Sequence, residues 1–186
     1  MSVEDILLDA EERMDKAIAH LKQNLLGIRT GRAAPGLLDS VKVNAYGSLS
    51  PLKQLASVAA PEPQQLVIKP FDTSLIKEIE KGIVASELGL NPQSDGRIIR
   101  INIPPLSTDT RKKLVARIKE LSEEAKISIR NVRRDANKAI ETAEKEKTIS
   151  EDDRDSAKED VQEMTKKYED EVSELAKARE SDVMEQ

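Results

Sequence analysis

The chain has no cysteine and no tryptophan, and among its 186 residues only one is histidine and three are aromatic. Without cysteine it cannot form a disulfide framework, a thiolate zinc site or a cysteine nucleophile. The single histidine, His20, has no second imidazole with which to bind a metal ion, and no nucleophile stands beside a plausible base. We therefore expect no enzyme active site, no metal site and no cofactor.

Long hydrophobic runs are also missing. No apolar run approaches the roughly 20 residues that a helix needs to span a bilayer. The first residues, Met1–Asp5, are acidic and lack the basic start and apolar stretch of a signal peptide. These absences predict a soluble, cytoplasmic protein.

Two short motifs imitate ligand sites without completing them. Gly31 and Gly36 have the spacing of a phosphate-binding loop, but Leu37 and Leu38 follow where lysine and serine or threonine are required, so we expect a turn. The acidic run Glu151–Asp153 could suggest a metal site. Carboxylates in the first turn of a helix are better explained by the helix dipole.

Glycine and proline are confined to the middle of the chain. All eight prolines lie between residues 35 and 105, and all seven glycines lie between residues 27 and 96. The stretch 106–186 contains neither, and nearly half of the whole chain is Ala, Glu, Lys, Leu or Arg, which is typical of long helices. The distribution predicts helices at both ends of the chain and a different kind of structure between them.

Apolar residues at helical spacing indicate three helices: one over residues 1–26, one that begins after Ser107, and one that begins after Ser150, where Asp153 completes a capping box. Three long amphipathic helices bury one another most simply in an antiparallel three-helix bundle. The residues expected to face its core are Val3, Leu7, Ala10, Met14, Ala17, Leu21 and Ile28, with Leu25 taking over where Asn24 breaks the stripe, then Leu114, Ile118, Leu121, Ala125, Ile129, Val132, Ala136, Ala139 and Ala143, then Ala157, Val161, Met164, Tyr168, Val172, Leu175 and Ala178.

The middle of the chain has the pattern of a small mixed domain. Alternating residues predict half-buried strands over 41–46 and 99–103, and Leu66–Ile68 predicts a buried strand. Helical spacing over 74–88 predicts a helix between them. We expect an α+β fold in which residues 1–30 and 105–186 form the bundle and residues 31–104 form an inserted β/α/β domain.

Two short segments connect the expected domain to the bundle, and both lie at the same end of the bundle because the first helix ends where the second begins. They contain Thr30, Gly31 and Arg32 on one side and Pro104 and Pro105 on the other. Two short connections predict a hinge. A domain held in place by contact with the bundle is the alternative.

Charge is unevenly distributed behind the formal net charge of −5. Residues 105–148 contain 12 basic and 8 acidic residues, whereas residues 149–186 contain 6 and 14. At about 100° per residue, six basic residues of the second helix fall roughly 100° to 200° from Val132, on the side away from the apolar stripe, and Glu123 is the one acid in that sector between residues 112 and 134. This basic ridge consists of Lys112, Lys119, Lys126, Arg130, Arg133 and Arg134.

A basic ridge of this kind neutralises phosphates and releases their counterions, so it predicts salt-sensitive binding to RNA. Arginine forks favour this interpretation because they bind phosphate in a bidentate manner. Three aromatic residues cannot supply a platform for base stacking, so recognition would be of backbone and shape. The alternative is a solvated face, some of whose groups pair with the acidic third helix.

Several motifs together resemble the bacterial ribosome recycling factor family. They are Ile28–Ala33 (IRTGRA), Gln54–Ser57 (QLAS), Leu88–Pro92 (LGLNP), Pro104–Leu106 (PPL), Arg130–Ala136 (RNVRRDA) and Ile149–Asp153 (ISEDD). No single motif is specific, but their order is kept over essentially the whole chain.

The resemblance implies an L-shaped protein that acts after translation termination. With elongation factor G, and GTP hydrolysis by that partner, such a protein separates the post-termination ribosome into subunits, and initiation factor three then keeps them apart. The bundle would contact the large subunit and its 23S ribosomal RNA, and elongation factor G would push the inserted domain. The implied RNA-binding residues are Arg133, Arg130 and Arg134, with Arg29, Arg32 and Arg111 toward the hinge.

The start of the second helix, Ser107–Lys112, departs from the usual Thr-x-Glu-Arg-Arg pattern of the family, so the resemblance does not fix the role of Arg111.

From the resemblance as a whole we expect a monomeric translation factor that is not an enzyme. The rival interpretation is a coiled-coil adaptor or chaperone-like module that binds protein alone, which predicts no salt-dependent association with RNA.

Overall fold

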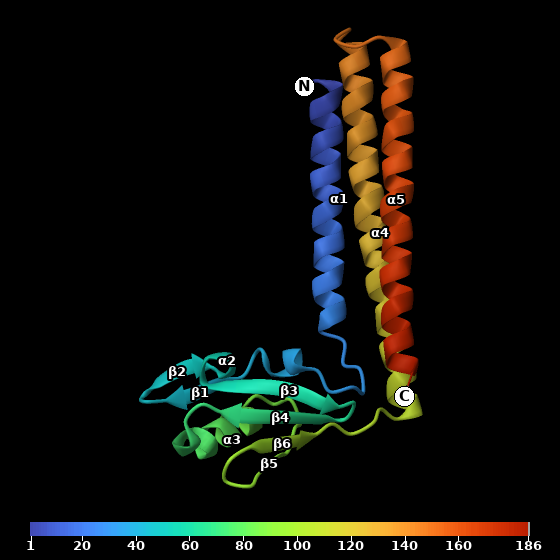
Figure 1. The fold of residues 1–186 in the computed structure, drawn as a ribbon. Coiled ribbons are helices and arrows are strands. Elements are labelled where there is room, and N and C mark those ends of the chain that lie inside the picture. The colour runs from blue at the N-terminus through green and yellow to red at the C-terminus, as the bar shows by residue number, and fades with distance from the viewer. Residues whose placement is uncertain (186) are drawn as a thin grey trace. The chain divides into compact units, whose positions relative to one another are not determined.

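The computed structural model describes residues 1–185, which divide into two compact units. Unit 1 contains residues 1–29 and 108–185, and unit 2 contains residues 30–107. Unit 1 is built from three helices, α1 (Val3–Leu26), α4 (Thr108–Lys145) and α5 (Glu151–Met184). Each packs against the other two, and successive helices along the chain run antiparallel (Figure 1). The expected three-helix bundle is confirmed.

Local signals in the sequence set the ends of these helices. Ser2 caps α1 in a capping box with Asp5, and Ser150 caps α5 in a capping box with Asp153. The helix α4 ends where Lys147 adopts a left-handed φ of 57°, and the Thr148 amide donates to the Ala143 carbonyl at 3.0 Å. This is a Schellman-type stop that turns the chain into α5.

The buried stripes of α1 and α5 differ in part from the expected ones. In α1, Leu25 is buried as expected, but Ile6 and Ile18 are buried as well, while the expected Leu7 and Ala17 are only half-buried. In α5 the buried set includes Thr165, Ala176 and Val183, whereas Ala178 is exposed, so its assignment to the core was wrong. The expectation followed a 3.5-residue repeat, but a straight helix repeats every 3.6 residues, so the buried positions drift along its surface.

Unit 2 contains two antiparallel sheets. The strands β1 (Lys42–Ala45) and β2 (Ser48–Pro51) form a hairpin. The strands β3 (Ala56–Glu62), β4 (Gln65–Pro70), β5 (Pro92–Ser94) and β6 (Ile99–Asn102) form a sheet in the order β3-β4-β6-β5. The helices are α3 (Ile76–Ala85), the short α2 (Leu52–Leu55) and the 3₁₀ turns η1 (Pro35–Leu38) and η2 (Thr73–Leu75).

The core of unit 2 lies between α3 and the strands. Ile79 and Ile83 of α3 are fully buried, as are Leu66 and Ile68 of β4 and Ile99 of β6. Gly82 allows α3 to approach β1 closely, because a Cβ at this position would lie 2.8 Å from the Lys42 carbonyl oxygen. Because of this close approach, the β1–β2 hairpin packs on the same hydrophobic core as the four-stranded sheet.

The α+β class is confirmed, but unit 2 has more strands than the three that the sequence predicts. The additional strands are β2, β3 and β5, and each is largely exposed or contains proline. The strands β3 and β5 lie at the two edges of the four-stranded sheet, where one side of the strand needs no hydrogen-bonding partner. Such strands lack the alternation of buried and exposed residues on which the prediction relied.

Candidate nucleic-acid interface

The basic ridge lies on one flank of α4, beside the seam that α4 forms with α5. Among residues 1–185, three ion pairs cross this seam: Arg130 with Glu169 at 3.1 Å, Glu141 with Lys158 at 2.7 Å, and Glu144 with Arg154 at 3.6 Å. The ridge was expected on the solvent face, and this is only partly true. Lys112, Lys119 and Arg134 are exposed, whereas Lys126, Arg130 and Arg133 are half-buried.

Arg130 is already bound by two carboxylates. Its Nε donates to Glu169 of α5 at 3.1 Å and its Nη1 donates to Glu123 of α4 at 3.2 Å. The hydrogen bonds to Glu169 and Glu123 raise the pKa of Arg130. The alternative expectation, that part of the ridge pairs with the acidic third helix, therefore holds at Arg130.

Arg133 and Arg134 differ from Arg130. Within residues 1–185, neither has a carboxylate within ion-pair distance. The neighbouring acid, Asp135, is turned toward α1, where Arg13 donates to its Oδ2 at 2.7 Å. The two guanidinium groups therefore offer uncompensated positive charge and unused donors on this flank.

The remaining candidates occupy different places. Lys112, Lys119 and Lys126 extend the flank along α4, and within the described part of the chain none of them forms an ion pair. Arg111, in the first turn of α4, is half-buried and already interacts with another group. Arg29 is half-buried, and its Nη2 is buried without a hydrogen-bond acceptor among residues 1–185.

The candidate hinge residues Thr30, Gly31, Arg32, Pro104 and Pro105 all belong to unit 2, and the boundaries between the units fall at residues 29/30 and 107/108. The turn between β3 and β4 fixes both ends of unit 2. The amide of residue 33 donates to the carbonyl of residue 63 at 2.6 Å, and the amide of residue 103 donates to that of residue 64 at 2.8 Å. Only short segments remain between these anchors and unit 1. Arg32 therefore does not share a unit with the other RNA-binding candidates.

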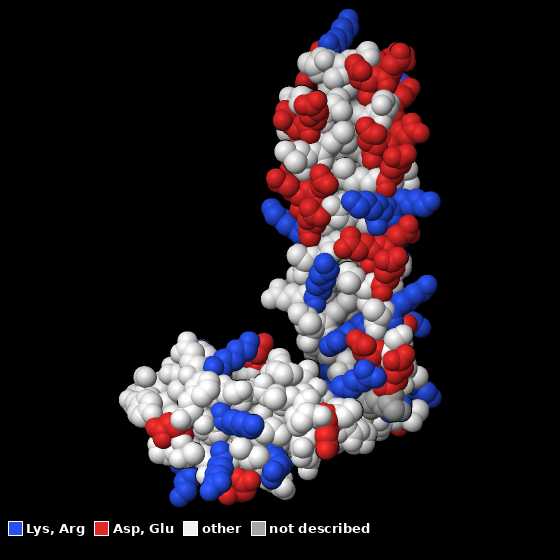
Figure 2. Space-filling view, viewed as in Figure 1, with Lys and Arg blue, Asp and Glu red and all other residues white. Residues whose placement is uncertain are grey.

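Charge also changes along the bundle, which the helical phase of α4 alone did not reveal. Residues 1–12 contain five acidic residues and no basic one, whereas residues 16–29 contain three basic residues and no acidic one. In Figure 2 the drawn face of unit 1 is accordingly richest in Asp and Glu toward the start of α1. The missed basic residues of α1 are Lys16 and Lys22, and their signal was the absence of acids from the last three turns of α1.

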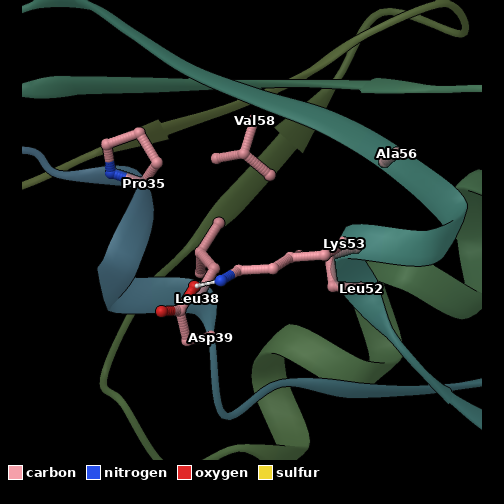
Figure 3. A pocket seen from close by; sticks show the side chains of 7 residues that line it. All are labelled: Pro35, Leu38, Asp39, Leu52, Lys53, Ala56 and Val58. Carbon is pink, nitrogen blue, oxygen red and sulfur yellow. Dashed lines mark ion pairs between the residues drawn. The ribbon is translucent and has the colours of Figure 1, made fainter.

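Unit 2 has a small pocket of about 140 Å³ (Figure 3). Lys53 Nζ and Asp39 Oδ1 form an ion pair of 2.8 Å across it. The residues that line the pocket are Pro35, Leu38, Asp39, Leu52, Lys53, Ala56 and Val58. Its lining is mainly apolar and offers no nucleophile with a base.

Residues 1–185 contain neither a metal-binding cluster nor a membrane-spanning helix. No group of three or more His, Cys, Asp or Glu residues in this range has the geometry to hold a metal ion. No described helix is both long and apolar enough to cross a bilayer.

Comparison with known proteins shows the family. The family model described as "Ribosome recycling factor" matches residues 21–184. The ribosome-recycling factor of Rhodopirellula baltica is 69% identical over 139 residues, which are 75% of each chain. That of Nitratidesulfovibrio vulgaris is 50% identical over 184 residues, which are 99% of each chain.

Solved structures agree with this result. A solution structure of a ribosome recycling factor matches with a TM-score of 0.79 and 41% identity, over 99% of this chain and 98% of that one. A second match, with a TM-score of 0.67 and 39% identity over 98% of this chain and 99% of that one, is to a structure of the T. thermophilus ribosome recycling factor and the E. coli elongation factor G bound to the E. coli post-termination complex. The resemblance inferred from the sequence motifs is thus confirmed, and the chain belongs to the ribosome recycling factor family.

Proposed function

We propose that this protein is a translation factor that separates the post-termination ribosome into its subunits, together with elongation factor G and GTP hydrolysis by that partner. Family membership supports this proposal, as does the similarity to a ribosome recycling factor bound, with elongation factor G, to the post-termination complex. The protein acts in the cytoplasm as a monomer and catalyses no chemical step itself. Initiation factor three then keeps the separated subunits apart.

In this proposal, unit 1 binds 23S ribosomal RNA of the large subunit through the flank of α4. The single observation that carries it is the pair of arginines, Arg133 and Arg134, that no described carboxylate neutralises. Guanidinium groups bind phosphate oxygens with two parallel hydrogen bonds, so two adjacent arginines can hold one turn of an RNA backbone.

The other candidates contribute in decreasing measure. Lys112, Lys119 and Lys126 add positive charge along the flank, while Arg130 must share its charge with Glu123 and Glu169. Arg29, Arg32 and Arg111 complete the proposed set toward the hinge. A buried guanidinium nitrogen without an acceptor costs free energy, and Arg29 Nη2 is such an atom. A phosphate oxygen that accepts a hydrogen bond from this nitrogen would remove that cost, so Arg29 would contribute strongly to binding.

Mechanical coupling is the second part of the proposal. The bundle anchors the protein, and unit 2 receives force from the GTPase and turns about Thr30, Gly31, Arg32, Pro104 and Pro105. The anchoring of both ends of unit 2 at the β3–β4 turn supports this mechanism, because only two short segments of chain remain between these anchors and unit 1.

Subunit splitting in a purified system tests the proposal. Post-termination ribosomes are mixed with the protein, elongation factor G and GTP, and separation is followed by light scattering. We expect splitting that requires all three components and is strongly reduced in Arg133→Glu. If the parent protein does not split ribosomes, the proposed function is contradicted. If Arg133→Glu splits them as fast as the parent, the proposed RNA-binding site is contradicted.

The hinge has its own test, which the absence of native cysteine makes clean. Ala34→Cys in unit 2 with Thr108→Cys in unit 1 introduces the only two thiols, one on each side of the connections, and a reducible bis-maleimide that bridges them restrains unit 2 relative to unit 1. We expect the bridged protein to bind the large subunit as before but to lose splitting, and reduction of the bridge to restore it. Full splitting by the bridged protein would refute the mechanical role.

A further inference from the structure

Among residues 1–185, Arg130 is the one member of the basic ridge that carboxylates already hold. Glu169 accepts a hydrogen bond from its Nε at 3.1 Å, and Glu123 accepts one from its Nη1 at 3.2 Å. One positive and two negative charges leave this group with a net charge of −1. Arg133 and Arg134, in the next turn of α4, have no such partners in this range. The flank of α4 therefore offers two open arginines and one that is occupied.

The two hydrogen bonds occupy both binding edges of the Arg130 guanidinium. A phosphate binds an arginine in a bidentate manner along one of two edges, formed by Nε with Nη2 or by Nη1 with Nη2. Glu169 takes a donor of the first edge, and Glu123 takes a donor of the second. Arg130 can therefore bind a phosphate along a complete edge only after one of these carboxylates has left it.

Local helix stability does not explain the bond to Glu123. Carboxylates that stabilise a helix lie three or four residues from their cation. Glu123 lies seven residues before Arg130, about two turns away, so both side chains must extend along α4 to meet. Glu169 comes from α5, and its side chain is 31% exposed beside an arginine that is 36% exposed. The three side chains thus meet at the surface of the α4–α5 seam, within reach of a large partner.

Competition with phosphate follows from this geometry. A carboxylate fixed beside the guanidinium has a high effective concentration, so RNA must displace it to use Arg130, and it returns when RNA withdraws. A carboxylate that stays in place instead faces the phosphate with a charge of the same sign, which is unfavourable. In either case Glu123 and Glu169 weaken the binding of RNA to this flank.

We propose that Glu123 and Glu169 are affinity-limiting residues, which compete with ribosomal RNA for Arg130 and thereby speed the release of the protein from the large subunit. This inference rests on the proposed function above, in which RNA binds the flank of α4. A protein that separates one ribosome after another must leave each of them. Bidentate contacts from three neighbouring arginines would slow that departure, and the return of a carboxylate to Arg130 favours it.

Removing the charge of Glu169 while keeping its shape tests this inference. In Glu169→Gln, we expect the affinity for purified large subunits to rise about three- to tenfold at physiological salt, mainly through slower dissociation. The slope of log K against log salt should become steeper by about one, because one more arginine neutralises a phosphate. The thermal unfolding midpoint should stay the same or fall, since an ion pair is lost. Glu123→Gln should also raise the affinity, and it serves as a second variant if Glu169→Gln folds poorly.

Two controls separate competition at Arg130 from a general change in charge. Asp170→Asn removes the same charge one residue further along α5, where Asp170 is exposed and forms no ion pair within residues 1–185. This variant should change the affinity by less than about twofold. In the Arg130→Gln background, where the shared target is gone, Glu169→Gln should raise the affinity no more than Asp170→Asn does.

Three results would overturn the inference. They are an affinity of Glu169→Gln and Glu123→Gln no higher than that of the parent, an equal gain in Asp170→Asn, and a gain in Glu169→Gln that persists in full in the Arg130→Gln background. Each of them leaves the proposed function intact if the parent binds large subunits and splits ribosomes. Failure of the parent to do so would remove the proposed function, and this inference with it.

Discussion

The two units of this protein present opposite kinds of surface. Unit 1 contains 22 basic and 28 acidic residues in its 107 residues, and its single aromatic ring is buried. Unit 2 contains 8 basic and 7 acidic residues in residues 30–107 and exposes two aromatic rings. Unit 1 is therefore acidic as a whole and basic only locally, along the flank of α4, whereas unit 2 is nearly neutral and exposes apolar rings.

The largest effect is expected when unit 2 is destabilised, which tests whether unit 1 still binds the large subunit on its own. Ile79 is fully buried in the core of unit 2, so Ile79→Ala should lower the free energy of unfolding of that unit by about 2–5 kcal/mol. Hydrogen exchange should show lost protection in residues 30–107, with the helices of unit 1 unchanged. Large-subunit affinity should be retained while splitting is lost, and loss of both would show that the units do not act separately.

A smaller effect is expected where α3 meets β1. Gly82→Ala places a Cβ 2.8 Å from the Lys42 carbonyl oxygen, so α3 must shift, and we expect unit 2 to lose about 1–3 kcal/mol of stability in denaturant unfolding. The matched control is Gly36→Ala, where the nearest atom lies 3.8 Å away and belongs to a side chain. Equal effects of the two substitutions would contradict the close approach.

The smallest effect concerns unit 1. The Tyr168 hydroxyl donates to Asp15 Oδ1 at 2.5 Å, so Tyr168→Phe should cost about 0.5–1.5 kcal/mol of stability in thermal or denaturant unfolding, with RNA binding unchanged. Loss of subunit affinity in this variant would contradict the assignment of the interface to α4.

The same tyrosine predicts a pH dependence. Burial and the hydrogen bond to Asp15 raise the pKa of Tyr168 above its ordinary value of 10.0. A raised pKa in the folded state means that the contribution is fully present below pH 10 and is lost as the pH rises beyond it. Above pH 10 the parent should therefore lose stability more steeply than Tyr168→Phe, and parallel pH profiles would show that Tyr168 is not responsible.

The sequence predicted most of the bundle because its signals are local. Ser150 with Asp153 fixes the start of α5, and the spacing of Ile118, Leu121 and Ala125 fixes the buried side of α4. The strands β2, β3 and β5 could not be predicted, since their stability comes from pairing with strands distant in the sequence. They carry no periodic signal of their own.

The candidate site was predictable in composition but not in pairing. Helical phase grouped Arg130, Arg133 and Arg134, yet whether each is neutralised depends on the register between α4 and α5. That register places Glu169 beside Arg130 and turns no described carboxylate of α5 toward Arg133. The exposure of Tyr46 likewise depended on the hairpin turn, which only the three-dimensional structure shows.

The central claim, that unit 1 holds RNA through the α4 flank, is tested most directly by the salt dependence of large-subunit binding. Arg133→Glu is compared with Arg117→Glu, the same change on the opposite flank of α4, where Arg117 already pairs with Glu120 at 2.7 Å. We expect Arg133→Glu to weaken binding at physiological salt by about 10- to 100-fold and to flatten the slope of log K against log salt by about one. Arg117→Glu should change neither quantity much. Equal affinities and equal slopes for the two variants would contradict the account.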